Sequence, residues 1–191
     1  MCAEPGRAPC AACAATTRAA PPGLVPPPPL QALHAALTYE GVGRELVARL
    51  KYRDARAAVG WLAATMVQAM PAPLPGTVVT WAPTTAARRR HRGFDQAELL
   101  ARAVARRAGL PTRATLLRAA GPAQTGRDLA HRTHPTGFRA RHRVPRARPV
   151  LVVDDVVTSG ATLAAAGRAL VAAGAWPVTG LVAAVTPPPG W

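Results

Sequence analysis

Apolar residues recur three and four positions apart in several stretches of the chain, which is the spacing of one buried face on a helix. The helices predicted in this way cover residues 42–50, 59–70, 97–105 and 161–173. Asp95 precedes the third of them and Glu98 follows three residues later, the spacing of a capping box. The fourth is expected to stop at Gly174, because glycine favours the conformation that ends a helix.

Short apolar or β-branched runs alternate with these helices and predict strands. The runs are residues 77–81, 115–117, 149–153 and 178–185. The run 149–153 is unbroken, as in a parallel strand that is covered on both faces. The alternation predicts an α/β domain over residues 39–187, with a parallel sheet flanked by helices. The basic segment 88–93 and the polar segment 120–148 are expected to be loops.

Residues 1–38 differ from the rest of the chain and are expected to form a short irregular N-terminal arm. They contain the three cysteines of the sequence and the proline run 26–29, which predicts a stiff connector. No apolar run of membrane-spanning length is free of proline, and the chain does not begin with the cationic and apolar pattern of a signal peptide. We therefore expect a cytoplasmic protein without membrane insertion.

Composition and charge limit both the state of the chain and the class of its ligand. The 191 residues are 49% hydrophobic and 17% charged, which excludes a fully disordered chain. The formal net charge is +15, and arginines between residues 84 and 148 carry most of it. Such a stretch suits a polyphosphate ligand or the backbone of a nucleic acid and does not distinguish between them.

The segment LVVDDVVTSGATL, residues 151–163, combines the groups that would bind a sugar phosphate. Asp154 and Asp155 lie at the carboxyl end of a predicted strand, where α/β sheets bind ligands. Adjacent carboxylates repel each other unless hydroxyl groups, a metal ion or another cation satisfy them. Two hydroxyl residues and a glycine then precede a helix N-terminus, which offers N–H groups to a phosphate. The alternative, a capped helix beside two surface aspartates, does not explain all of these residues in this order.

Two motifs resemble a known family. The pattern VVDDVVTSGAT, residues 152–162, is similar to the motif with which type I phosphoribosyltransferases bind 5-phosphoribosyl-1-pyrophosphate (PRPP). The pattern RGFDQAELLA, residues 92–101, resembles the RGFNQ-x-x-x-LA signature of the ComF family, with Asp95 in the place of the asparagine. The resemblance covers about residues 39–186 and implies a phosphoribosyltransferase-like core.

The resemblance also implies a role for individual residues. Asp154 and Asp155 would contact the ribose hydroxyls, directly or through Mg²⁺, and with Arg92 they are the candidate catalytic residues. The residues that would hold the 5′-phosphate are Val156, Val157, Thr158, Ser159, Gly160, Ala161 and Thr162. The residues that would hold the pyrophosphate are Pro83, Thr84 and Arg92.

ComF relatives often carry a zinc site of four cysteines near the N-terminus. By this resemblance Cys2, Cys10 and Cys13 would be zinc ligands, but a structural zinc site needs four. Either the site has eroded, or a further cysteine lies upstream of Met1. His34 is a substitute ligand in principle, although a surface position on a helix is the favoured interpretation.

Three functions are compatible with these observations. The first is a phosphoribosyltransferase that uses PRPP and Mg²⁺, transfers the phosphoribosyl group to an unidentified acceptor and releases pyrophosphate. The second is a ComF-type factor in competence and DNA uptake that binds single-stranded DNA and keeps the PRPP site as a sensor or relic. The third is a regulator that responds to PRPP without turnover. The acceptor would contact residues 1–38 and 120–148, and whether the protein is a monomer or a homodimer stays open.

Overall fold

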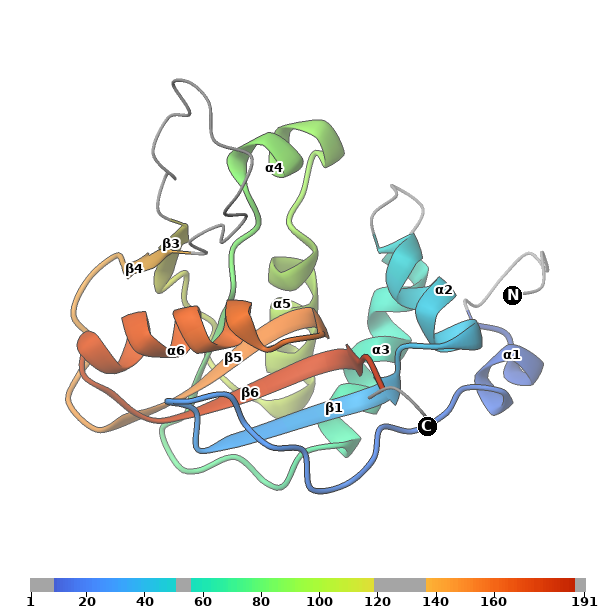
Figure 1. Cartoon of the computed structure of the whole chain (residues 1–191), viewed down its shortest axis with the longest axis horizontal. Helices are drawn as coiled ribbons and strands as arrows, with labels where there is room; N and C mark the ends of the chain where they lie inside the picture. Colours follow the sequence, from blue (N-terminus) through green and yellow to red (C-terminus); the bar gives the residue numbers. More distant parts are fainter. Residues whose placement is uncertain (1–8, 51–55, 119–136, 188–191) are drawn as a thin grey trace, which may run out of the picture.

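The computed structural model describes residues 9–50, 56–118 and 137–187, and Figure 1 shows its helices and strands. In chain order they are α1 (Ala11–Ala15), β1 (Ala32–Thr38), α2 (Gly41–Arg49), α3 (Arg56–Gln68), β2 (Val78–Trp81), α4 (Ala86–Arg92), α5 (Gln96–Ala108), β3 (Leu116–Arg118), β4 (Phe138–Ala140), β5 (Arg148–Val157), α6 (Ala161–Ala172) and β6 (Ala175–Val185). None of the helices in these described ranges has the length together with the apolar character that a bilayer crossing requires.

The main sheet has four parallel strands in the order β1-β6-β5-β2. β5 pairs with β6 on one side and with β2 on the other, so that Val153 lies opposite both Leu181 and Trp81. Neighbouring parallel strands need crossover connections, and α6 supplies the one between β5 and β6. The predicted α/β class, with a parallel sheet flanked by helices, is confirmed.

Helices cover both faces of this sheet (Figure 1). Leu151 and Val153 of β5 pack with α2, α3 and α5, whereas Val150 and Val152 pack with α6 on the opposite face. None of these four side chains is more than 3% exposed. Burial on alternate sides explains why the run 149–153 is apolar at every position from Val150 onward rather than at every second one.

β1 lies within the segment 1–38 that the sequence analysis assigned to the N-terminal arm. It pairs in parallel with β6, with Leu37 opposite Ala184. Gly180 of β6 leaves room for Leu30, whose Cδ2 atom would lie 2.8 Å from a β-carbon at that position. The end of the arm is therefore part of the sheet. Its alanines give a weak strand pattern, and periodicity alone does not reveal it.

The basic segment 88–93 is helical, so the prediction of a loop was wrong there. Thr85 caps the start of α4, because its side-chain hydroxyl accepts a hydrogen bond from the backbone N–H group of Arg88. Gly93 ends the helix with a φ of 80°. α4 has no buried residue, so its sequence contains no apolar periodicity from which a helix could be predicted.

The predicted strand at 115–117 is present as β3, but it does not join the main sheet. It pairs antiparallel with β4, with Leu117 opposite Arg139. Thr115 links the two sheets, because its N–H group donates to Thr80 Oγ1 at 3.3 Å and its carbonyl accepts from the Arg141 N–H group at 2.8 Å. The small sheet is thereby held beside the carboxyl end of β2.

Candidate functional site

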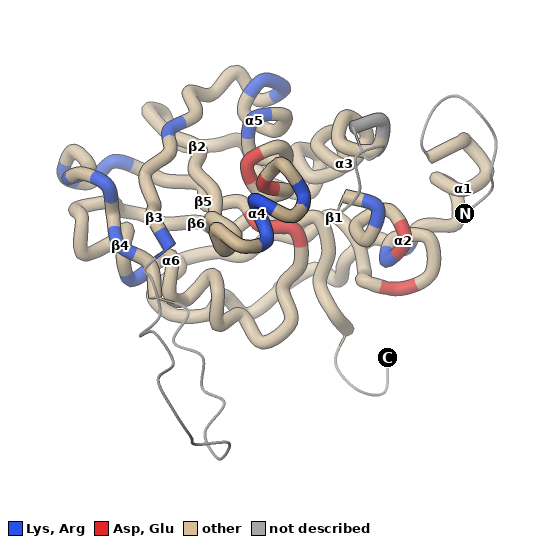
Figure 2. The backbone as a smooth tube through the Cα atoms, turned by 90° about the horizontal axis from the view of Figure 1, so that it is seen from above, with Lys and Arg blue, Asp and Glu red and all other residues tan. Residues whose placement is uncertain are grey.

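A polar cavity of about 360 Å³ lies between the turns that follow β2 and β5. Because these strands are parallel neighbours, their carboxyl ends meet at the same edge of the sheet, where α/β proteins bind ligands. Basic side chains of α4 and the carboxylates at the end of β5 line the same space. In Figure 2 the blue positions of α4 accordingly lie beside red, acidic positions.

Asp154 and Asp155 lie near the carboxyl end of β5, and both line the cavity. Each carboxylate is held by the next backbone N–H group. The Asp155 N–H group donates to Asp154 Oδ1 at 2.9 Å, and the Val156 N–H group donates to Asp155 Oδ1 at 2.8 Å. These two bonds hold one oxygen of each carboxylate, and both carboxylates line the cavity.

The carboxyl of Asp154 is electrostatically unfavourable in its charged form. Loss of solvent around it raises its pKa well above the ordinary value of 3.8, and the charge of Asp155 raises it further. Asp95 adds a smaller effect of the same sign. A cation or a set of hydroxyl donors placed between these carboxylates would relieve the repulsion.

This arrangement predicts a pH dependence of stability. Because the folded-state pKa of Asp154 is raised, the folded protein holds this proton more tightly than the unfolded chain does. Stability is therefore lost as the pH rises from about 4 through the folded-state pKa, and each pH unit between the two pKa values costs about 1.4 kcal/mol. In urea titrations of the ligand-free protein, Asp154→Asn should remove this loss and unfold at a higher urea concentration than wild type at pH 8 but not at pH 4. Parallel pH profiles for the two proteins would contradict the assignment.

The N-terminus of α6 forms the next wall of the cavity. Thr158 and Thr162 line it, and the Ala161 N–H group of the helix donates to Ser159 Oγ at 3.5 Å. Gly160 occupies the cap position with a φ of 75°, a left-handed conformation that favours glycine. Pro27 of the N-terminal arm covers this residue, and its ring carbons would lie 3.0 Å from a β-carbon at Gly160. The arm thus supports the turn from outside, and the inner side offers hydroxyl and N–H donors to an anion.

Asp95 links the turn after β2 to the start of α5. It is 4% exposed and caps α5, where its Oδ1 accepts from the N–H groups of Ala97 at 3.0 Å and Glu98 at 3.4 Å. Its Oδ2 accepts from the Thr84 N–H group at 2.8 Å, which fastens the turn after β2 to the helix. Burial raises the pKa of Asp95, and these three hydrogen bonds oppose that effect.

Three arginines face the cavity from two elements. Arg88 and Arg92 come from α4, and Arg118 comes from the end of β3. Arg118 Nη1 donates to the Pro83 carbonyl at 3.1 Å, and the guanidinium lies 5.3 Å from the centre of the Phe138 ring. Burial lowers the pKa of Arg118, and the positive charge of Arg88 lowers it further. None of the ion pairs formed among the described residues includes these three side chains, although the negative charges of Asp154 and Asp95 oppose the lowering of the Arg118 pKa.

The structure brings most of the predicted site residues into this one cavity. Those that line it are Pro83, Thr84, Arg92, Asp154, Asp155, Val156, Thr158 and Thr162. Four others of the phosphate turn do not line it, namely Val157, Ser159, Gly160 and Ala161. Sequence reasoning did not assign Tyr39, Gln96 or Arg118 to the site, although all three line it. Arg118 had no distinguishing signal among the many arginines, whereas Gln96 belongs to the RGFDQ motif.

Two of the predicted zinc ligands, Cys10 and Cys13, do not line this cavity. Cys10 precedes α1 and Cys13 is buried within it, whereas Cys2 lies outside the described residues. Across residues 9–50, 56–118 and 137–187, no group of three or more His, Cys, Asp or Glu side chains is placed to hold a metal ion. His34 is in β1 rather than on a helix, so that expectation was wrong. Zinc binding stays a prediction.

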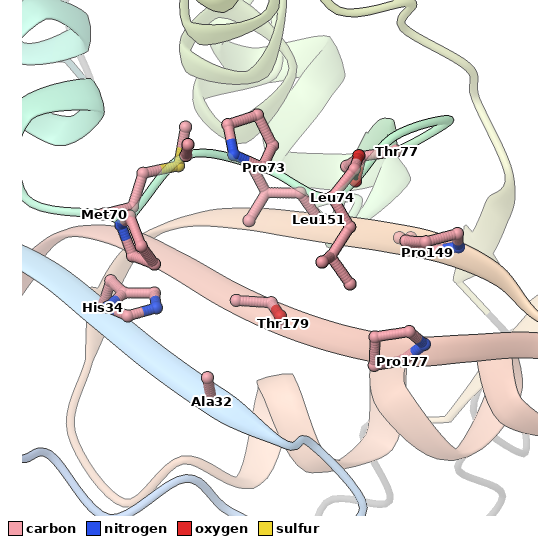
Figure 3. A pocket seen from close by; sticks show the side chains of 13 residues that line it. Ala32, His34, Met70, Pro73, Leu74, Thr77, Pro149, Leu151, Pro177 and Thr179 are labelled. Atoms are coloured by element: carbon pink, nitrogen blue, oxygen red, sulfur yellow. Dashed lines mark hydrogen bonds between the residues drawn. The ribbon is translucent and has the colours of Figure 1, made fainter.

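A second cavity, of about 340 Å³, lies near the amino ends of β5 and β6. Figure 3 shows His34 of β1 and Thr179 of β6 below the loop that contains Pro73. Burial lowers the pKa of His34, and none of the residues that line this cavity carries a fixed charge. An apolar space of this kind is unsuited to a phosphorylated ligand. The candidate site is therefore the polar cavity between the turns after β2 and β5, which we call the charged cavity because Asp154, Asp155 and three arginines line it.

This chain is similar to some solved structures, whereas its sequence matches no protein-family model and no curated protein significantly. The chain is similar to the allosteric regulatory enzyme of purine biosynthesis, with a TM-score of 0.48 and 19% identity over 71% of this chain and 30% of that chain. It is also similar to adenine phosphoribosyltransferase from Leishmania tarentolae, with a TM-score of 0.38 and 15% identity over 70% of this chain and 72% of that one. The chain thus spans less than a third of the first of these proteins.

Proposed function

We propose that the charged cavity binds PRPP and that the protein transfers the phosphoribosyl group to an acceptor, with release of pyrophosphate. The observation that carries this proposal is the meeting of three features in one cavity: two carboxylates, a helix N-terminus with glycine at the cap position, and three arginines. PRPP presents a diol, a 5′-phosphate and a pyrophosphate, one group for each feature. The resemblance of residues 152–162 to a PRPP-binding motif and of residues 92–101 to the ComF signature supports the same function.

Each group of the ligand has a matching part of the wall. Asp154 and Asp155 would accept hydrogen bonds from the ribose hydroxyls, because both carboxylates line the cavity. The turn 158–162 would hold the 5′-phosphate at the N-terminus of α6. The side that would hold the pyrophosphate consists of Thr84, Arg88, Arg92 and Arg118.

The same carboxylates fit a magnesium ion. Carboxylate oxygens are the ligands that Mg²⁺ takes from proteins, usually one or two of them beside phosphate oxygens. The raised pKa of Asp154 arises from burial and from the charge of Asp155, and a bound cation would remove the second cause. When bound together with PRPP, Mg²⁺ would neutralise part of the pyrophosphate charge.

The chemistry asks little of the side chains beyond placement. In the proposed reaction the bond from ribose C1 to pyrophosphate breaks through an oxocarbenium-like state, and a bond from C1 to the acceptor forms. Asp154 and Asp155 would fix the ribose. Arg88, Arg92 and Arg118 would stabilise the negative charge that develops on the departing group. No nucleophilic side chain is required.

Arg118→Met should weaken the binding of inorganic pyrophosphate about tenfold or more, because it removes a charge-assisted hydrogen bond. The methionine keeps an unbranched side chain, whereas the guanidinium and its contact with the Phe138 ring are removed. Isothermal titration calorimetry with Mg²⁺ present measures the affinity. Arg106→Met is the matched control, since Arg106 lies in the last turn of α5 and does not line the cavity. Equal losses in both variants would indicate a general charge effect and contradict the assignment.

The direct test of the function is turnover. The protein is incubated with PRPP and Mg²⁺ in the presence of a panel of nucleobases and related amines, and pyrophosphate release is measured. Release that depends on one acceptor supports transfer. Binding of PRPP without release for any acceptor would leave the non-catalytic sensor as the better account.

Single-stranded DNA is a second candidate ligand. The observation that favours it is the exposed basic surface of α4, which carries Arg88, Arg89 and Arg90. Arg–phosphate binding weakens steeply with salt. A gel shift with an oligonucleotide that persists at low salt and disappears at several times that salt concentration would support this function, and no shift at low salt would exclude it.

A further inference from the structure

Gln96 is the first residue of α5 and lines the charged cavity, yet the residue is only 3% exposed. The Nε2 atom is shielded from solvent and has no hydrogen-bond acceptor among the described residues. Buried polar groups of proteins are almost always paired, so an unpaired amide in a cavity wall requires an explanation.

The amide gives the free protein no evident benefit. A methionine has nearly the same length and would fill the same space without leaving two N–H donors unpaired. The backbone of residue 96 already starts the helix, and Asp95 supplies the cap of α5. Neither the helix nor the core therefore depends on the amide of Gln96.

Gln96 lies on the side of the cavity that is proposed to hold the pyrophosphate. Its neighbour Asp95 accepts a hydrogen bond from the Thr84 N–H group at 2.8 Å, so Gln96 lies beside the turn after β2. Arg88, Arg92 and Arg118 line the same cavity as this turn. The end torsion of a glutamine is soft, so its amide can turn toward a ligand oxygen without movement of the helix.

We propose that Gln96 is a ligand-binding residue whose N–H groups donate to the oxygens of a diphosphate group, and that it remains unpaired until this group is bound. The inference rests on the proposed function, because the diphosphate is the pyrophosphate of PRPP. It adds a neutral donor to the three arginines. A neutral donor recognises a phosphoryl oxygen at short range without increasing the repulsion among the positive charges.

The test compares two glutamines. Gln96→Met should leave the melting temperature of the free protein unchanged or raise it, and should weaken the binding of inorganic pyrophosphate with Mg²⁺ about tenfold. Binding of ribose 5-phosphate should change less than twofold, because that ligand has no diphosphate. Gln96→Glu should weaken pyrophosphate binding further by charge repulsion.

Gln31 is the matched control. Its Nε2 donates to the Pro29 carbonyl at 2.6 Å and its Oε1 accepts from the Val178 N–H group at 2.6 Å, away from the cavity. Gln31→Met should therefore lower the melting temperature and leave binding unchanged. The proposal is overturned if Gln96→Met destabilises the free protein as Gln31→Met does, if pyrophosphate affinity is unaffected, or if ribose 5-phosphate is lost equally. If wild type binds neither PRPP nor pyrophosphate, the proposed function itself fails.

Discussion

Replacement of both carboxylates at the end of β5, Asp154→Asn with Asp155→Asn, should lower the affinity for PRPP about a hundredfold or more. Each asparagine keeps an oxygen for the backbone N–H group that now holds the carboxylate, so the turn is expected to persist. What is lost is the charge that would orient the ribose hydroxyls and a cation. Calorimetric titration with PRPP and Mg²⁺ measures the change.

The free double variant should meanwhile be at least as stable as wild type at pH 8. The substitution removes two neighbouring negative charges, and the pKa of Asp154 is raised by burial and by the charge of Asp155. Glu40→Gln is a suitable control, because Glu40 is only partly buried, pairs with Arg18 and does not line the cavity. If the double variant binds PRPP as tightly as wild type does, these aspartates do not take part in PRPP binding. If the double variant is unfolded, their role is structural.

Asp95→Ala should produce the largest loss of stability. The buried carboxylate accepts from Thr84, Ala97 and Glu98, and alanine would leave these N–H groups without an acceptor. Loss of a helix cap together with unpaired buried donors is expected to cost about 2–4 kcal/mol. That is a large share of the stability of an ordinary domain, and denaturant unfolding followed by circular dichroism measures it.

Asp95→Asn separates the two functions of this side chain. An asparagine oxygen can still cap α5, but its NH₂ group would then face the Thr84 N–H group, a donor opposite a donor. We expect a loss of about 1–2 kcal/mol and weaker pyrophosphate binding, because the turn after β2 is no longer fastened to the helix. A loss below about 0.5 kcal/mol in Asp95→Ala would show that these hydrogen bonds contribute little.

The fold could be predicted where burial leaves a trace in the sequence. The unbroken run of β5 identified a strand covered on both faces, and Asp95 marked the start of α5. α4 left no such trace, since it has no buried residue and depends on a Thr85 cap and on Gly93 at its end. Those two residues are local signals of the helix, but they do not stand out in a segment dominated by arginine.

The candidate site could be predicted where its residues are contiguous. Asp154 lies in β5 and the turn 158–162 follows directly after that strand, so their spacing alone indicated a sugar-phosphate site. Arg118 depends on contacts across 35 positions with Pro83 and on the packing of β3 against β4, which no local pattern records. Gln96 was visible within its motif, but its unpaired amide is a property of the folded cavity.

The proposal that PRPP binds between the ends of β2 and β5 can be tested by isothermal titration calorimetry of the full chain with PRPP and Mg²⁺ at neutral pH. We expect one molecule to bind per chain with a dissociation constant well below the millimolar range, and we expect pyrophosphate to compete with it. Absence of heat and of any thermal shift at millimolar PRPP, with a folded protein, would contradict it.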